Sequence, residues 1–227
     1  LTNSGQLGAG SVRAAALTNA AGASLVATGA VEAASVVNLA GLHAGSVAAS
    51  GALTNRGALV AADGVTAGSA LANLGAGATL DAVRVAATAG TLTNEGSLRA
   101  QSVTAGLDLR NSGTIRAAGI EAGQDLGNLA GGLLRHGAAS AGAVVPRAGR
   151  LPAAAAAHAA ATGGPPLGVP VAGSAAATIT EGAALAVTAL RDVTNLHAII
   201  AATDLTVTAG GALSNASAGA WMLAQSG

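Results

Sequence analysis

Acidic side chains are the residues of this sequence whose spacing comes closest to that of a chemical site. Asp63 and Asp81 each follow an asparagine by eight residues, and Asp108 and Asp125 each follow one by fourteen. Carboxylates that recur at one offset can stack on one face of a repetitive fold, where they would suit a weak cation site. A carbohydrate-active enzyme would need a larger cluster of acidic or basic groups in one groove. Because the sequence offers only isolated pairs, we favour simple solvated faces.

Other reactive residue types lack the spacing that catalysis or metal binding requires. The chain has no cysteine and no Gly-x-Ser-x-Gly nucleophile turn. Trp221 is either a binding anchor or, as we favour, a packing residue of the last repeat. Four histidines share no metal-ligand spacing, and we expect them in solvent or in loops: His43, His136, His158 and His197. The sequence therefore predicts no enzyme, no bound metal and no cofactor.

The composition predicts a thin core and excludes several classes of partner. Hydrophobic residues make up 51% of the chain, yet there is no Phe or Tyr and only one Trp, so Ala, Val and Leu must fill the interior. Ten arginines balance ten acidic residues, and this zero net charge argues against nucleic acid and anionic membranes. No stretch of 18 apolar residues is free of charge and proline, which argues against a transmembrane segment. The start at Leu1, without a signal-type segment, leads us to expect a fragment or a processed product.

The asparagines reveal an internal repeat. Every asparagine follows a leucine or valine by two positions, and the first eight are spaced 16, 19, 17, 18, 21, 17 and 17 residues apart. Around Asn94 and Asn111 the unit reads Leu-x-Asn-x-Gly-x-(Leu/Ile), with a further apolar residue downstream. The ten asparagines are Asn3, Asn19, Asn38, Asn55, Asn73, Asn94, Asn111, Asn128, Asn195 and Asn215. A unit this short excludes helix pairs and leucine-rich repeats.

Alternation of apolar and polar residues within each unit predicts short strands. In Leu98-Arg-Ala100 and Leu205-Thr-Val207 one face is apolar and the other polar. Two or three such strands with corners make one coil, so we predict an all-β parallel β-helix, or solenoid, with coils of 16 to 21 residues. Where a glycine follows the asparagine by two positions, as at Gly96 and Gly113, it is expected to supply the positive φ of a sharp corner. Asparagine also tolerates left-handed backbone, and stacked asparagines are expected to form an amide ladder along the rod.

A break in the repeat predicts three regions. The repeat array covers residues 1–133, a low-complexity insertion covers 134–177, and a second, longer-coiled array covers 178–227. The insertion holds all five prolines and is rich in Ala and Gly, which is typical of partly disordered segments. Within it, Ala153–Ala161 behind Pro152 is expected to form at most a short helix.

These units resemble the haemagglutinin repeats of the filamentous haemagglutinin family, the large exoproteins of bacterial two-partner secretion. The resemblance rests on Leu-x-Asn-x-Gly-x-(Leu/Ile)-x-Ala units joined by Val-x-Ala-Gly-x-x-Leu, as in Leu92–Leu109, and on Asp204–Asn215. It covers about residues 1–133 and 179–227. It implies a right-handed coil, export through an outer-membrane partner pore, and display as a long fibre that adheres to cells or presents a toxin.

Within that family the segment is expected to be shaft, because it has neither a secretion-domain Asn-Pro-Asn signature nor a toxin-like globular end. We therefore expect a structural shaft segment of a secreted, surface-displayed adhesin. Its partner would be an unidentified receptor or glycan on a host or neighbouring cell. Three alternatives stay open: the shaft of a contact-dependent inhibition toxin carrier, a carbohydrate-active β-helix enzyme, and a mostly disordered spacer.

Overall fold

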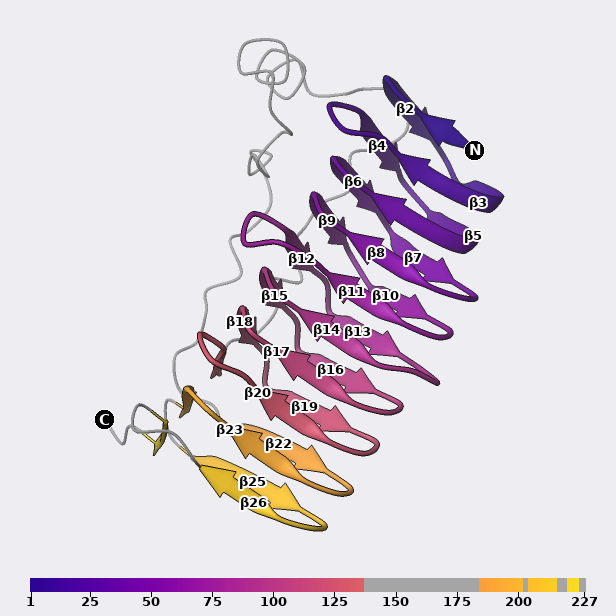
Figure 1. The fold of residues 1–227 in the computed structure, drawn as a ribbon. Helices are drawn as coiled ribbons and strands as arrows, with labels where there is room; N and C mark the ends of the chain where they lie inside the picture. The colour runs from indigo at the N-terminus through magenta and orange to yellow at the C-terminus, as the bar shows by residue number, and fades with distance from the viewer. Residues whose placement is uncertain (137–183, 202–203, 216–219, 225–227) are drawn as a thin grey trace.

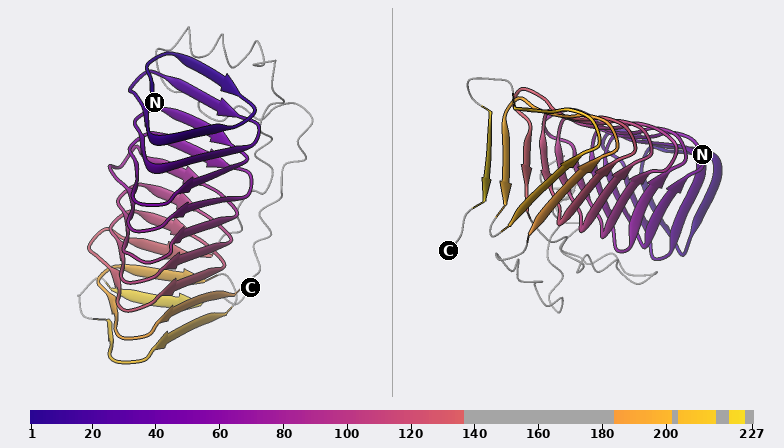
Figure 2. Two further views of the ribbon diagram at one scale, coloured as in Figure 1. Left: turned by 90° about the vertical axis from the view of Figure 1, so that its right-hand side faces the viewer. Right: turned by 90° about the horizontal axis from the view of Figure 1, so that it is seen from below.

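The protein is a parallel β-solenoid. The computed structural model describes residues 1–136, 184–201, 204–215 and 220–224. All regular secondary structure elements in these ranges are β-strands. Successive coils stack on one another into a rod, with β2 (Gln6–Ala9) and β26 (Leu213–Asn215) near opposite ends (Figures 1 and 2). The prediction of an all-β solenoid with parallel strands is confirmed.

The strands of successive coils form three rows, which we name the Asn row, the Leu row and the Val row, and each described coil except the last contributes a segment to all three. The Asn row comprises β1 (Thr2–Asn3), the second halves of β3 (Val12–Asn19) and β5 (Ala30–Asn38), then β8 (Leu53–Asn55), β11 (Leu71–Asn73), β14 (Leu92–Asn94), β17 (Leu109–Asn111), β20 (Leu126–Asn128), β23 (Val193–Asn195) and β26. The Leu row comprises β2, β4 (Ser24–Ala27), β6 (Gly41–Ala44), β9 (Ala58–Ala61), β12 (Thr79–Asp81), β15 (Ser97–Arg99), β18 (Thr114–Arg116), β21 (Leu133–Arg135), β24 (Ala198–Ala201) and β27 (Trp221–Ala224). The Val row comprises the first halves of β3 and β5, then β7 (Ser46–Ala49), β10 (Gly64–Ala67), β13 (Arg84–Ala87), β16 (Ser102–Ala105), β19 (Gly119–Ala122), β22 (Leu185–Ala189) and β25 (Leu205–Ala209).

The core is a narrow column of small and branched aliphatic side chains. Strand residues alternate between the interior and the outside, and like residues stack in register, with Leu92 beside Leu109 and Leu98 beside Ile115. All four of these side chains are fully buried. Burying one such side chain contributes about 1.5–3 kcal/mol, and repetition in every coil replaces the large aromatic residues that a thick core would need.

The corner after each asparagine corrects one prediction. Gly57, Gly96 and Gly113 follow asparagine by two positions, but none of them has a positive φ, and no described asparagine does either. Their role is close approach between coils, since a Cβ on any of the three would lie 2.2 Å from a backbone oxygen of the preceding coil. Among the described residues, positive φ occurs only at Gly22, Gly75 and Gly131, which lie in corners lengthened by extra residues after Asn19, Asn73 and Asn128.

The stack continues across the proline-rich segment. Residues 137–183, with the predicted helix Ala153–Ala161 and nearly all of the predicted insertion, lie outside the described residues. The last described strand before these residues is a Leu-row strand, β21, and the first described strand after them is a Val-row strand, β22. There β22 pairs with β19, and β23 pairs with β20 so that Asn195 lies beside Asn128. The coils on either side of the segment therefore form one ladder.

Candidate functional site

The ten asparagines form a single hydrogen-bonded column inside the rod. The side-chain Nδ2 of each donates to Oδ1 of the asparagine one coil further on, at 2.7–2.8 Å, from Asn3 to Asn215. The side chains from Asn19 to Asn195 have no exposed surface. Nine consecutive bonds of this kind tie each coil to the next.

Backbone carbonyls satisfy the second hydrogen of these amides. Asn94, for example, also donates to Gly96 O at 3.1 Å and to Thr114 O at 3.2 Å, while its Oδ1 accepts from Asn73 Nδ2 at 2.8 Å. A buried polar network stabilises a fold when all its members are satisfied. With their donors and acceptors engaged and no access to solvent, the interior asparagines hold the coils in register and are not placed to act on a substrate.

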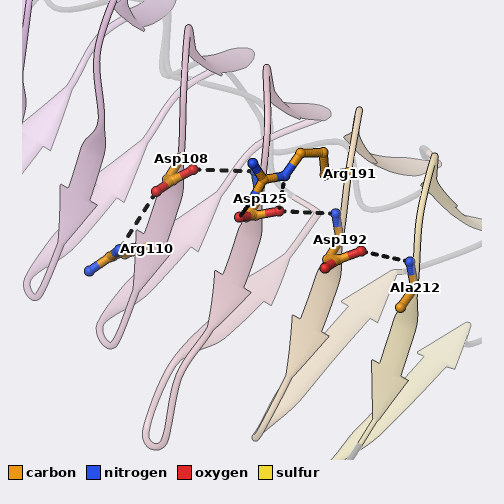
Figure 3. A network of polar contacts seen from close by, with 6 residues as sticks. All are labelled: Asp108, Arg110, Asp125, Arg191, Asp192 and Ala212. Atoms are coloured by element: carbon orange, nitrogen blue, oxygen red, sulfur yellow. Dashed lines mark hydrogen bonds and ion pairs between the residues drawn. The ribbon is translucent and has the colours of Figure 1, made fainter.

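Three aspartates line an outer corner, each one residue before an Asn-row strand (Figure 3). Asp108 and Asp125 lie on adjacent coils, and Asp192 extends the row. Each carboxylate accepts the backbone N–H of the equivalent residue one coil on: Asp125 N to Asp108 Oδ1 at 3.4 Å, Asp192 N to Asp125 Oδ1 at 3.2 Å, and Ala212 N to Asp192 Oδ1 at 2.7 Å. These carboxylates thus extend the hydrogen bonding between coils to the surface.

Arginines form ion pairs with two of the three aspartates in this row. Arg191 binds both oxygens of Asp125, with Nε at 3.1 Å from Oδ1 and Nη2 at 2.5 Å from Oδ2, and Arg110 Nη2 lies 3.6 Å from Asp108 Oδ2 (Figure 3). The hydrogen bond from Arg191 holds the pKa of Asp125 below its ordinary value, and the same bond raises the pKa of Arg191. Carboxylates engaged by N–H and guanidinium groups are poor cation ligands, and the described residues hold no group of three or more His, Asp or Glu that could bind a metal. Asp108 and Asp125, which were predicted to stack on adjacent coils, therefore do so as hydrogen-bonded, ion-paired carboxylates.

Asp63 and Asp81 are not brought together. Asp81 pairs in register with Val60 on one side and Arg99 on the other, whereas Asp63 lies in the corner that precedes the Val row. The corner after Asn73 contains extra residues, so the eighth residue after Asn73 lies at a different place on the coil from the eighth residue after Asn55. Equal distance from an asparagine therefore does not guarantee the same place on the coil.

The histidines do not form a site within the described residues. His43 lies on β6 between Val26 and Val60, its Nε2 has no hydrogen-bond partner, and burial lowers its pKa. His136 directly follows β21, His197 lies in the corner after β23, and His158 lies outside the described residues. The expectation of solvent or loop positions therefore fails for His43, which lies on a strand.

Sequence reasoning missed a column of three arginines on the outside of the Leu row. Arg99, Arg116 and Arg135 occupy equivalent positions on β15, β18 and β21 and pair in register one after another. The signal was partly visible, because Arg99 and Arg116 each follow an asparagine by five residues. Arg135 follows Asn128 by seven, since that corner is two residues longer, and this hid the column.

Two further surface features complete the outside of the rod. A shallow groove of about 480 Å³ crosses the first Val-row strands, floored by alanines such as Ala33 and Ala49 and flanked by the ion pair of Arg13 with Glu32. This pair neutralises its own charge, and the alanines offer no reactive group. Trp221, at the end of the Leu row, is 56% exposed. Its ring is therefore not buried in the last described coil, contrary to the packing role that we favoured.

Comparison with known proteins gives no match: no protein family, curated protein or solved structure resembles the chain closely enough to be assigned. The described residues include no helix long and apolar enough to span a membrane.

Proposed function

We propose that this chain is a segment of the structural shaft of a secreted, surface-displayed exoprotein of the filamentous haemagglutinin type, which mediates adhesion to cells. The observation that carries the proposal is the unbroken asparagine column through ten coils. A solenoid of this kind is compatible with a shaft or an adhesin.

The geometry supports a rod-shaped spacer of constant cross-section. Nine intervals between ten coils, at a strand spacing of 4.7–4.9 Å, give a rod about 43 Å long. Each coil contacts only its neighbours, so length grows with the number of repeats while cross-section stays constant. A chain without cysteines suits passage through a membrane pore in an unfolded state, because no disulfide can form beforehand.

The aspartate row supports the shaft over the alternative of a carbohydrate-active enzyme. Glycoside hydrolysis needs a pair of carboxyl groups facing the same bond across a substrate. Asp108, Asp125 and Asp192 instead lie along one corner and bind backbone N–H and guanidinium groups. Such carboxylates hold adjacent coils together and are not available as a catalytic acid–base pair.

Spin-label distances test the rod directly. The chain has no cysteine, so Thr66→Cys and Thr188→Cys introduce the only two thiols, and both sites face outward on the Val row. Four register steps separate them, through Ala86, Thr104 and Glu121, so we expect backbone separations of about 19 Å with a narrow distribution. The pair at Thr66 and Thr104 serves as control, at about half that distance. A broad or much longer distribution for the first pair would contradict a rigid shaft.

Adhesion is tested by coating beads with the folded chain and counting the cells that they retain. Beads carrying the same chain unfolded by Asn94→Ala together with Asn111→Ala provide the control. We expect retention only on beads with the folded chain. Equal retention on both would argue that any adhesion is non-specific.

A further inference from the structure

The arginine column is a one-dimensional array of positive charge on a flat, regular face. Arg99, Arg116 and Arg135 follow one another at a single strand spacing, so the three residues span about 10 Å along the rod. Their strand neighbours Leu98 and Ala100 are buried. Strand alternation therefore directs the three guanidinium groups outward.

This arrangement of arginines does not stabilise the fold. Like charges directly opposite one another on paired strands are destabilising, and Arg116 has an arginine on both sides. Burial, followed by the charges of Arg135 and Arg99, lowers the pKa of Arg116. Neither Arg116 nor Arg135 has an acidic partner in the part of the chain that the structure describes, and Arg99 has only Asp81, at 4.0 Å.

Several arginines elsewhere on the rod are paired with acidic residues. Arg13 is paired with Glu32, and Arg191 with Asp125, each through two guanidinium nitrogens. Those pairs cancel charge within the fold. The arginine column leaves charge uncancelled, and an external anion can supply what the protein does not.

We propose that the arginine column binds the carboxylates of a linear acidic polysaccharide, of the polyuronate class, laid along the axis of the rod. The proposal rests on the proposed function and deepens it by naming the ligand class. A guanidinium group presents a planar fork of donors that matches a carboxylate. The regular spacing suits an extended polymer with repeated charges, and the outward Ser97 and Thr114 on the same strands offer hydroxyls for sugar hydroxyls.

The scarcity of aromatic residues disfavours a nucleic acid on this surface. Proteins that bind single strands combine basic grooves with aromatic platforms on which bases stack, and the only aromatic residue of the chain, Trp221, lies two coils beyond Arg135.

Binding to polygalacturonate tests the proposal, measured by biolayer interferometry on the full chain at several salt concentrations. The test variant carries Arg99→Gln, Arg116→Gln and Arg135→Gln. A matched control carries Arg13→Gln, Arg56→Gln and Arg84→Gln, which removes the same charge from other places. We expect the test variant to lose at least tenfold in affinity and the control less than threefold. For three contacts, the logarithm of wild-type affinity should fall with the logarithm of salt concentration with a slope of about −2.

Replacement of all three column arginines by lysine separates geometry from charge. Lysine keeps the charge but lacks the fork, so we expect affinity between those of wild type and the glutamine variant. Circular dichroism melts establish that each variant is folded, and Arg116→Gln alone carries the test if the triple variant is not.

Three outcomes would overturn the proposal: no wild-type binding at low salt, equal loss in the matched control, or tighter binding of oligo(dT) than of polygalacturonate. Absence of binding together with narrow spin-label distances would refute the proposed ligand site but not the proposed shaft. Broad spin-label distance distributions would refute the proposed shaft.

Discussion

The asparagine column makes a quantitative prediction about Asn94. In Asn94→Ala, Asn111 Oδ1 loses its donor and becomes a buried oxygen without its ladder partner, and Asn73 Nδ2 keeps only Ser97 O at 3.3 Å. Carbonyl contacts to Gly96 and Thr114 also disappear. Each net hydrogen bond contributes about 1 kcal/mol, and an orphaned buried group costs about 1–3 kcal/mol. We therefore expect unfolding free energy to fall by about 3–5 kcal/mol.

Position along the rod provides the comparison. Asn3 has an asparagine neighbour on one side only and is 8% exposed, so water can replace part of what Asn3→Ala removes. We expect about 1–2 kcal/mol there. Thr93→Ala, on the same strand as Asn94 but outward, should cost less than about 0.5 kcal/mol. Urea unfolding followed by far-UV circular dichroism measures all three variants.

Asn94→Asp separates hydrogen bonding from shape. The new side chain has the same size but, when ionised, has no hydrogen to donate and turns an oxygen toward Asn111 Oδ1. Burial and this contact would raise its pKa in the folded state above the unfolded value. The variant should therefore gain stability relative to wild type as pH falls from 7 toward 4, and lose it as pH rises. The reasoning is refuted if Asn94→Ala is as mild as Thr93→Ala, or if Asn94→Asp shows no such pH dependence.

Three other perturbations test the corners, the core and the aspartate row. Gly68→Ala places a Cβ 1.9 Å from Ser50 O and should destabilise by about 1–3 kcal/mol in urea unfolding, whereas Gly119→Ala meets nothing within 4 Å and should be neutral or stabilising by up to about 1 kcal/mol; equal effects would contradict the close-approach argument. Leu98→Ala should lower the free energy of unfolding by about 2–5 kcal/mol in the same assay. A decrease below about 1 kcal/mol would mean that the apolar core around Leu98 is loosely packed. The folded pKa of Asp125 is lowered from its ordinary value of 3.8, so its stabilising effect is present above that pH and is lost as pH falls through the folded value. Melting temperature should thus decline less steeply below pH 4 in Asp125→Asn than in wild type, and parallel curves would mean that the ion pair contributes nothing.

The fold was predictable because its determinants recur at one place in every coil. Leu-x-Asn marks the same strand each time, and local alternation gives the two faces. The role of the corner glycines was not predictable, because it depends on how closely the preceding coil approaches Gly96 and not on the φ of that glycine. A sequence pattern reports on the residue itself and not on its neighbours in the next coil.

The outer rows were harder to predict because corner lengths vary. Asp63 and Asp81 share an offset but not a position, while Arg116 and Arg135 share a position but not an offset. Offsets counted from an asparagine hold only until the next corner. Counting from the buried leucine or isoleucine of each Leu-row strand (Leu98, Ile115 and Leu134) would have found the arginine column, because Arg follows that residue directly in all three coils.

The asparagine column also joins two coils that lie far apart in the sequence. The bond between Asn128 and Asn195 joins residues 67 apart, against 17 between Asn111 and Asn128. Even a wholly flexible connection would cost only about 0.6 kcal/mol for each doubling of length, or about 1.2 kcal/mol here. One buried leucine offsets this, and the two coils add a full set of strand pairings and the Asp125–Arg191 ion pair. The order of coils is therefore fixed by side chains that meet in space, whatever the length of chain that connects them in the sequence.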